Sequence, residues 1–175
     1  VIGKKEKRAV NKVLENGSIS SFGTMGPKFY GGKYIQKFEK EVAKYHGIGH
    51  AIAVNSATSG LHCAVAAAKA GPGNEVIVPS YTFTATASSV LMNNAIPVFA
   101  DIDPETFCLD PNDVRNKVTS RTKAIIPVHL LGHPCDMLKI MEIAKENNLI
   151  VIEDVAQAPG ARTNGQLCGT IGDMG

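Results

Sequence analysis

The chain has 175 residues, of which 44% are hydrophobic and 19% are charged, and its formal net charge is +2. This composition is typical of a globular domain with room for one core, and no apolar run approaches the roughly 18 residues of a membrane helix. The small net charge argues against a nucleic-acid binder, and the polar first residues are unlike a secretory signal peptide, so we expect neither a nucleic-acid nor a membrane partner.

The four cysteines are far apart in the sequence, so the close pairs of a zinc site are absent. A disulfide framework is not expected in a chain of this size without a secretory signal. We therefore interpret all four as reduced thiols, most of them small buried hydrophobes, and expect a cytoplasmic protein. The cysteines are Cys63, Cys108, Cys135 and Cys168.

The first part of the chain predicts two helices separated by a glycine-rich loop. Residues 6–16 are amphipathic and end at Gly17, and residues 18–32 are rich in glycine. Residues 34–45 place apolar side chains at helical spacing, and glycines follow them.

From residue 51 onward, short apolar runs alternate with helical stretches. The runs are continuously apolar, which is typical of strands covered on both faces. The alternation predicts a three-layer α/β/α fold with a mostly parallel sheet. Strands are expected at 51–54, 75–78, 97–100, 123–128 and 149–152. Helices are expected at 59–69, about 82–93 and about 136–147, with a short helix that begins at Pro111 after Asp110 as N-cap.

Polar residues follow several of these strands. Because right-handed crossovers bring the carboxyl ends of parallel strands to one edge, and ligands bind at that edge, these residues are expected to converge on one site. They are residues 55–59, Ser80 to Phe83, His129, and Glu153 with Asp154.

The segment from Asn55 to Gly60 joins a strand to a helix and is rich in hydroxyls. A helix start offers free N–H groups and the positive end of the dipole, which favour phosphate. The segment lacks the Walker and dinucleotide-binding patterns. The alternative to a phosphate site is an ordinary helix cap by Ser56 or Thr58.

Asp154 follows an apolar strand directly, where a carboxylate is costly to bury without a cation or hydrogen bonds. A protonated pyridine nitrogen is one cation that fits, and a turn cap is the alternative. Gln157 is placed to hydrogen-bond a ring substituent or to be an ordinary surface amide, and Phe83 to stack on a flat cofactor or to pack in the core. Gly132 and Pro134 break any helix near His129, so no helical metal pair is expected.

Taken together, these segments resemble the DegT/DnrJ/StrS aminotransferases, which are fold-type I enzymes dependent on pyridoxal phosphate (PLP). The resemblance covers nearly the whole chain, and the order and spacing of the segments make it specific. The segments are Phe38-Glu39, Tyr45 to Gly47, Ala53 to Leu61, Gly73 to Phe83, Pro97 to Asp103, Ile126 to Gly132, and Val151 to Ala161.

The resemblance implies a role for each matching position. Asp154 would pair with the pyridine nitrogen of PLP, Gln157 would contact the phenolic-oxygen side, and Phe83 would stack on the ring. Thr58 and Ser59 would hold the phosphate, and His129 would line the substrate pocket. The Schiff-base lysine is expected beyond Gly175, so no catalytic residue is assigned in this chain.

The resemblance also implies the domain plan and the activity. Residues 1–32 would form an N-terminal helix and loop, and residues 33–175 the first portion of the PLP-binding large domain, whose C-terminal part and small domain are absent. The parent enzyme would form a homodimer and transfer an amino group, usually from glutamate, to a nucleotide-linked keto-sugar for surface polysaccharides or antibiotics. The alternatives are a sugar dehydratase or deoxygenase with histidine in place of the lysine, a non-catalytic assembly module, and another fold-type I enzyme such as a desulfurase.

Overall fold

The computed structural model describes residues 2–17 and 29–175. The chain forms two compact units, Val1–Ala53 and Val54–Gly175. Most of the expected glycine-rich loop, residues 18–28, lies outside the described residues. The sequence predicted a domain boundary after residue 32, and the helix that follows that position belongs to the first unit.

The first unit contains two helices, α1 (Lys4–Glu15) and α2 (Lys33–His46), as the periodicity predicted. The Gly3 N–H donates to the Glu6 carboxylate at 2.7 Å, which closes the first turn of α1. The α2 helix ends at Gly47, whose φ of 68° is the left-handed conformation that glycine adopts at low cost.

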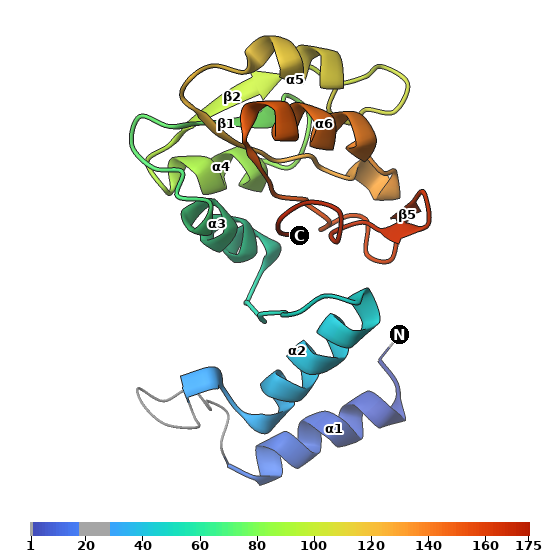
Figure 1. The fold of residues 1–175 in the computed structure, drawn as a ribbon. Coiled ribbons are helices and arrows are strands. Elements are labelled where there is room, and N and C mark those ends of the chain that lie inside the picture. The colour runs from blue at the N-terminus through green and yellow to red at the C-terminus, as the bar shows by residue number, and fades with distance from the viewer. Residues whose placement is uncertain (1, 18–28) are drawn as a thin grey trace. The chain divides into compact units, whose positions relative to one another are not determined.

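The second unit is built on a four-stranded parallel sheet with the strand order β2-β1-β3-β4 (Figure 1). This confirms the α/β class with a parallel sheet. The strands are β1 (Glu75–Pro79), β2 (Ile96–Ala100), β3 (Thr122–Ile125) and β4 (Ile150–Val151).

Helices cover both faces of this sheet, so its strands carry apolar side chains on both sides. Val76 and Val78 of β1 pack with α3 (Ala57–Ala67) and α4 (Ala85–Leu91). Ile77, between them, packs on the opposite face with α5 (Pro111–Lys117) and α6 (Met137–Asn147). This alternation of strand side chains produces the three layers visible in Figure 1.

One expected strand does not form. Residues 51–54 are extended but belong to no strand, and Ile52 is 83% exposed. Their β-like composition is not sufficient, because a strand also needs a neighbouring edge with which to pair, and no described strand offers one. The prediction of a strand at 51–54 is therefore wrong for this chain.

The last segment adds structure that the sequence reading missed. A hairpin joins β5 (Arg162–Thr163) to β6 (Gln166–Leu167) through Asn164-Gly165, both with positive φ. Asn-Gly is a strong sequence signal for this turn. Farther along, Met174 forms a parallel bridge with Ile152, so the chain extends the sheet beside β4. None of the described helices is long and apolar enough to cross a membrane.

Candidate functional site

Asp154 lies where the sequence predicted it, at the carboxyl end of the sheet. Its N–H donates to the Pro127 carbonyl at 2.9 Å, and its carbonyl accepts from the His129 N–H at 3.1 Å. These bonds continue the pairing between β3 and β4 past the strand ends. The residue is only 7% exposed, so its carboxylate needs polar partners.

Two protein groups donate to the Asp154 carboxylate. The Thr86 hydroxyl donates to Oδ2 at 3.0 Å, and the Ala156 N–H donates to Oδ1 at 3.2 Å. An ionised carboxylate has about four acceptor positions, so two remain for a cationic or N–H partner. The site thus holds a buried acceptor in a fixed orientation with spare capacity.

Sequence reasoning missed Thr86. It lies in the first turn of α4, is fully buried, and is separated from Asp154 by 68 positions in the chain. A threonine in an apolar helix carries no local mark of its partner. Only the packing of α4 on the sheet brings the two side chains together.

Phe83 belongs to the loop that leads from β1 into α4. Its carbonyl accepts from the Thr86 N–H at 3.2 Å, which ties this loop to the residue that holds Asp154. The Phe83 ring is 70% exposed, so its faces are open for stacking instead of being used in the core. In the same loop, the buried hydroxyl oxygen of Thr82 has no hydrogen-bond partner within the described part of the chain. A buried hydroxyl without a protein partner requires an explanation, such as an ordered water or a bound group.

Thr58 and Ser59 lie in the first turn of α3. Ser56 is the N-cap: its hydroxyl accepts from the Ser59 N–H at 3.2 Å and lies 3.1 Å from the Ser59 hydroxyl. The Ala57 and Thr58 N–H groups keep no partner among the described residues, as at any helix start. The first turn of α3 therefore has the N-cap that the sequence predicted as one alternative. It also has the free N–H groups that the other alternative, a phosphate site, requires.

Gln157 is exposed, and its side chain is held by the loop after β3. Its Oε1 accepts from the Leu131 N–H at 2.9 Å. Leu131 has a φ of 52°, an uncommon conformation for leucine that marks a constrained turn. The contact leaves the side-chain NH₂ of Gln157 available as a donor.

His129 is fully buried, and both of its ring nitrogens have protein partners. Nδ1 accepts from the Cys135 N–H at 3.0 Å, so Nε2 carries the proton and donates to Glu153 at 2.9 Å. The role expected for His129 in a substrate pocket stays a prediction. Its observed contacts connect the loop after β3 to the strand end of β4.

Glu153 is the second residue that the sequence reading did not interpret individually. Its carboxylate is 2% exposed and accepts hydrogen bonds from the N–H groups of Gly169, Ile171 and Gly172 at 2.7–2.8 Å, in addition to that from His129. Burial alone would raise the pKa of Glu153, but these four donors together hold it below its ordinary value of 4.5. The ionised side chain therefore fixes residues 169–172 against the sheet.

The buried acceptor Asp154 and the loop of the exposed Phe83 lie at the carboxyl ends of the parallel strands, and the capped start of α3 follows an extended segment outside the sheet. A buried carboxylate with spare acceptor positions and an exposed aromatic ring suit a flat ligand with a ring N–H, and a helix start suits a phosphate group. The structure joins the Phe83 loop to Asp154 through Thr86. No described hydrogen bond joins Thr58 or Ser59 to Asp154.

The chain belongs to the DegT/DnrJ/EryC1/StrS aminotransferase family, whose model matches residues 1–175. It is 51% identical over 142 residues to a GDP-perosamine synthase of Caulobacter vibrioides, covering 81% of this chain and 38% of the relative. It is 43% identical over 166 residues to a UDP-N-acetyl-3-dehydro-alpha-D-glucosamine 3-aminotransferase of Acidithiobacillus ferrooxidans, covering 95% and 42%. The chain thus spans about two fifths of the length of these relatives.

Solved structures agree with this assignment. An aminotransferase from Psychrobacter cryohalolentis superposes with a TM-score of 0.90 at 39% identity, covering 98% of this chain and 42% of that one. NtdA of Bacillus subtilis, described with bound cofactor PMP, superposes with a TM-score of 0.80 at 36% identity, covering 93% and 35%. The fold is therefore that of about two fifths of the PLP-dependent aminotransferases that it matches, and PLP is the cofactor of the family.

Proposed function

We propose that this protein is a PLP-dependent aminotransferase that transfers an amino group, derived from glutamate in the family pattern, to a nucleotide-linked keto-sugar. The observation that carries the proposal is the buried Asp154 carboxylate, held by Thr86 and Ala156 at the carboxyl end of the sheet. Membership of the family supports the reaction type. The names of two relatives, which contain a GDP-sugar and a UDP-linked dehydro-sugar, support the substrate class.

The described residues fit PLP. Asp154 would hold the pyridine nitrogen with its remaining acceptor positions, and Phe83 would stack on one face of the ring. The α3 helix start, with Thr58 and Ser59, would hold the phosphate through free N–H groups and hydroxyls. Gln157 would donate its NH₂ to the phenolic-oxygen side of the ring. The orphaned hydroxyl of Thr82, beside Phe83, is a further group that needs a partner.

When bound, PLP supplies an electron sink for the negative charge that develops on the carbon undergoing amino transfer. Asp154 contributes by keeping a proton on the pyridine nitrogen, because an ionised carboxylate at that atom favours its charged form. Thr86 and the Ala156 N–H keep the carboxylate aimed in one direction, which lowers the cost of reorganisation on binding. Phe83 excludes water from the ring face that it covers.

The finer parts of the proposal rest on the family pattern. The Schiff-base lysine would lie beyond Gly175, the active sites would form in a cytoplasmic homodimer, and the product would enter surface-polysaccharide or antibiotic-sugar synthesis. The 175-residue chain alone would then hold PLP without catalysing transfer. A histidine in place of that lysine would instead indicate a sugar dehydratase.

A PLP titration of this chain, followed by absorbance, tests the site. We expect saturable binding that Asp154→Asn weakens at least about tenfold, since it removes a charge-assisted hydrogen bond. The control is Asp101→Asn, the same change at an exposed position after β2, which should bind as the wild type does.

Phe83→Ala provides a second variant whose fold is not at risk, because the ring is exposed. It should weaken binding several-fold. Equal binding by wild type, Asp154→Asn and Phe83→Ala would refute the assigned site, as would absence of binding. Covalent fixation of PLP by borohydride would contradict the placement of the lysine beyond Gly175.

A further inference from the structure

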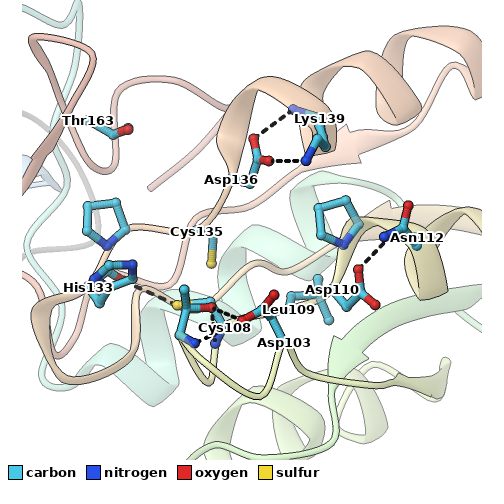
Figure 2. Close-up of a pocket in the computed structure, with 13 residues that line it drawn as sticks. Asp103, Cys108, Leu109, Asp110, Asn112, His133, Cys135, Asp136, Lys139 and Thr163 are labelled. Carbon is cyan, nitrogen blue, oxygen red and sulfur yellow. Dashed lines mark hydrogen bonds and ion pairs between the residues drawn. The ribbon is translucent and has the colours of Figure 1, made fainter.

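Two of the four thiols lie together on the wall of a cavity of about 360 Å³ that is lined mainly by polar residues. Figure 2 shows the sulfur atoms of Cys108 and Cys135 turned toward one another. The cavity lies between the loop that follows β2 and the loop that precedes α6. None of these residues is assigned to the proposed PLP site, so the inference below does not depend on it.

Local hydrogen bonds fix the Cys108 thiol. The Asp103 N–H donates to the Cys108 carbonyl at 2.8 Å, and the Phe107 N–H donates to the Asp103 carbonyl at 2.8 Å, which closes a tight turn. Phe107 has a φ of 58°, so the turn is constrained. The Cys108 S–H lies 3.4 Å from the His133 carbonyl.

The Cys135 thiol is fixed in the same way, directly before α6. Its S–H donates to the Val128 carbonyl at 3.0 Å, and its N–H donates to His129 Nδ1 at 3.0 Å. Both cysteine residues are almost completely buried, at 3% and 2% exposure, apart from the cavity that they line. A small molecule that enters the cavity therefore meets two oriented sulfur atoms.

The two thiols are electrostatically unequal. The neighbouring Cys135 side chain lowers the pKa of Cys108 to about 6, in spite of burial, with help from the Leu130 N–H. The Cys108 side chain, together with burial, raises the pKa of Cys135. The pair thus combines a thiol that ionises more readily with one that keeps its proton, the arrangement of an attacking and a resolving cysteine.

We propose that Cys108 and Cys135 form a peroxide-reactive dithiol that closes to an intramolecular disulfide. The Cys108 sulfur attacks one oxygen of hydrogen peroxide; an S–O bond forms, the O–O bond breaks, and the leaving hydroxide takes a proton to become water. The Cys135 sulfur then attacks the Cys108 sulfur; the S–S bond forms, the S–O bond breaks, and a second water leaves with the Cys135 proton. The two thiols lose two electrons in total, which reduce one peroxide to two waters.

The other two cysteines lack this arrangement. Cys63 is exposed on α3, away from the cavity wall. Cys168 is buried and close enough to interact with both members of the pair, but burial raises its pKa and it does not line the cavity. Cys168 is therefore the competitor that the experiment must distinguish.

The test uses the folded chain with Cys63→Ser, which prevents links between molecules. After treatment with hydrogen peroxide, the chain is unfolded, its free thiols are alkylated, and its peptides are mapped by mass spectrometry. We expect one linked pair of peptides, containing Cys108 and Cys135, which dithiothreitol separates. Unfolding the chain in urea before the peroxide step should slow the reaction by about tenfold, because the low thiol pKa depends on the fold.

Three variants separate this pair from its competitor. Cys108→Ser and Cys135→Ser should each abolish the link, whereas Cys168→Ser should leave it unchanged. A disulfide that contains Cys168, or three free thiols after peroxide treatment, would overturn the proposal. The peptide map of the chain with Cys63→Ser alone is decisive even where a further variant fails to fold.

Discussion

Replacing Glu153 with glutamine tests whether this buried carboxylate holds the last segment of the chain. Each carboxylate oxygen accepts two hydrogen bonds: one from Ile171 and Gly172, the other from His129 and Gly169. In glutamine, an NH₂ group replaces one of these oxygens. In either orientation of the amide, two buried N–H donors then lose their acceptor and face the NH₂ group instead. Each donor left without a partner costs about 1–3 kcal/mol.

The expected loss is therefore about 4 kcal/mol, a large part of the roughly 5–15 kcal/mol that stabilises a typical domain. For a chain of this size, this corresponds to a fall in melting temperature of roughly 10 °C. Thermal and urea unfolding followed by circular dichroism measure it. The matched control is Glu142→Gln, the same change at an exposed position of α6, which should stay within about 0.5 kcal/mol of wild type.

The effect should also depend on pH with a defined sign. Because the folded-state pKa of Glu153 is lowered, the carboxylate contributes stability above its ordinary pKa of 4.5, and this contribution is lost as pH falls through the folded-state value. The difference between wild type and Glu153→Gln should then be largest near neutral pH and shrink in acid. A variant as stable as wild type at neutral pH would refute the reasoning.

Two further substitutions probe the site and its surroundings. Thr86→Val keeps the shape of the side chain but removes the hydrogen bond to Asp154, so we expect the free energy of unfolding in urea to fall by about 1.5–3 kcal/mol. The control, Thr84→Val at an exposed position, should show no measurable loss. Equal stabilities of the two variants would show that the bond contributes nothing. Gly172→Ala places a Cβ 2.8 Å from a carbonyl oxygen of β4 and should cost about 1–3 kcal/mol, whereas Gly49→Ala, with open space around it, should be neutral; a neutral Gly172→Ala would mean that the segment shifts freely.

The position of Asp154 was predictable because it depends on local sequence. An apolar strand followed directly by a carboxylate places Asp154 at the carboxyl edge of a parallel sheet, and a hydroxyl before an apolar helix predicts the Ser56 cap. The Asn164-Gly165 turn was equally predictable, since both residues have the positive φ that such a hairpin requires, but the signal was not read.

The partners within the site were not predictable. Thr86 reaches Asp154 across 68 positions of the chain, and His129 reaches Glu153 across 24, and no spacing rule connects residues so distant in sequence. The same holds for Cys108 and Cys135, which the sequence presents only as isolated thiols. The extended run at 51–54 shows the converse: its composition favours a strand, but a strand exists only where a neighbour supplies hydrogen bonds.

By itself, the sequence determined the alternation of strands and helices, the apolar faces that produce three layers, and the edge of the sheet at which polar residues gather, because each of these follows from periodicity and from the handedness of crossover connections. Only the tertiary structure decided which side chains pair: the donors on Asp154, the four donors on Glu153, and the two sulfur atoms beside one cavity. Pairing depends on which elements pack against each other, and that packing is a property of the whole folded unit.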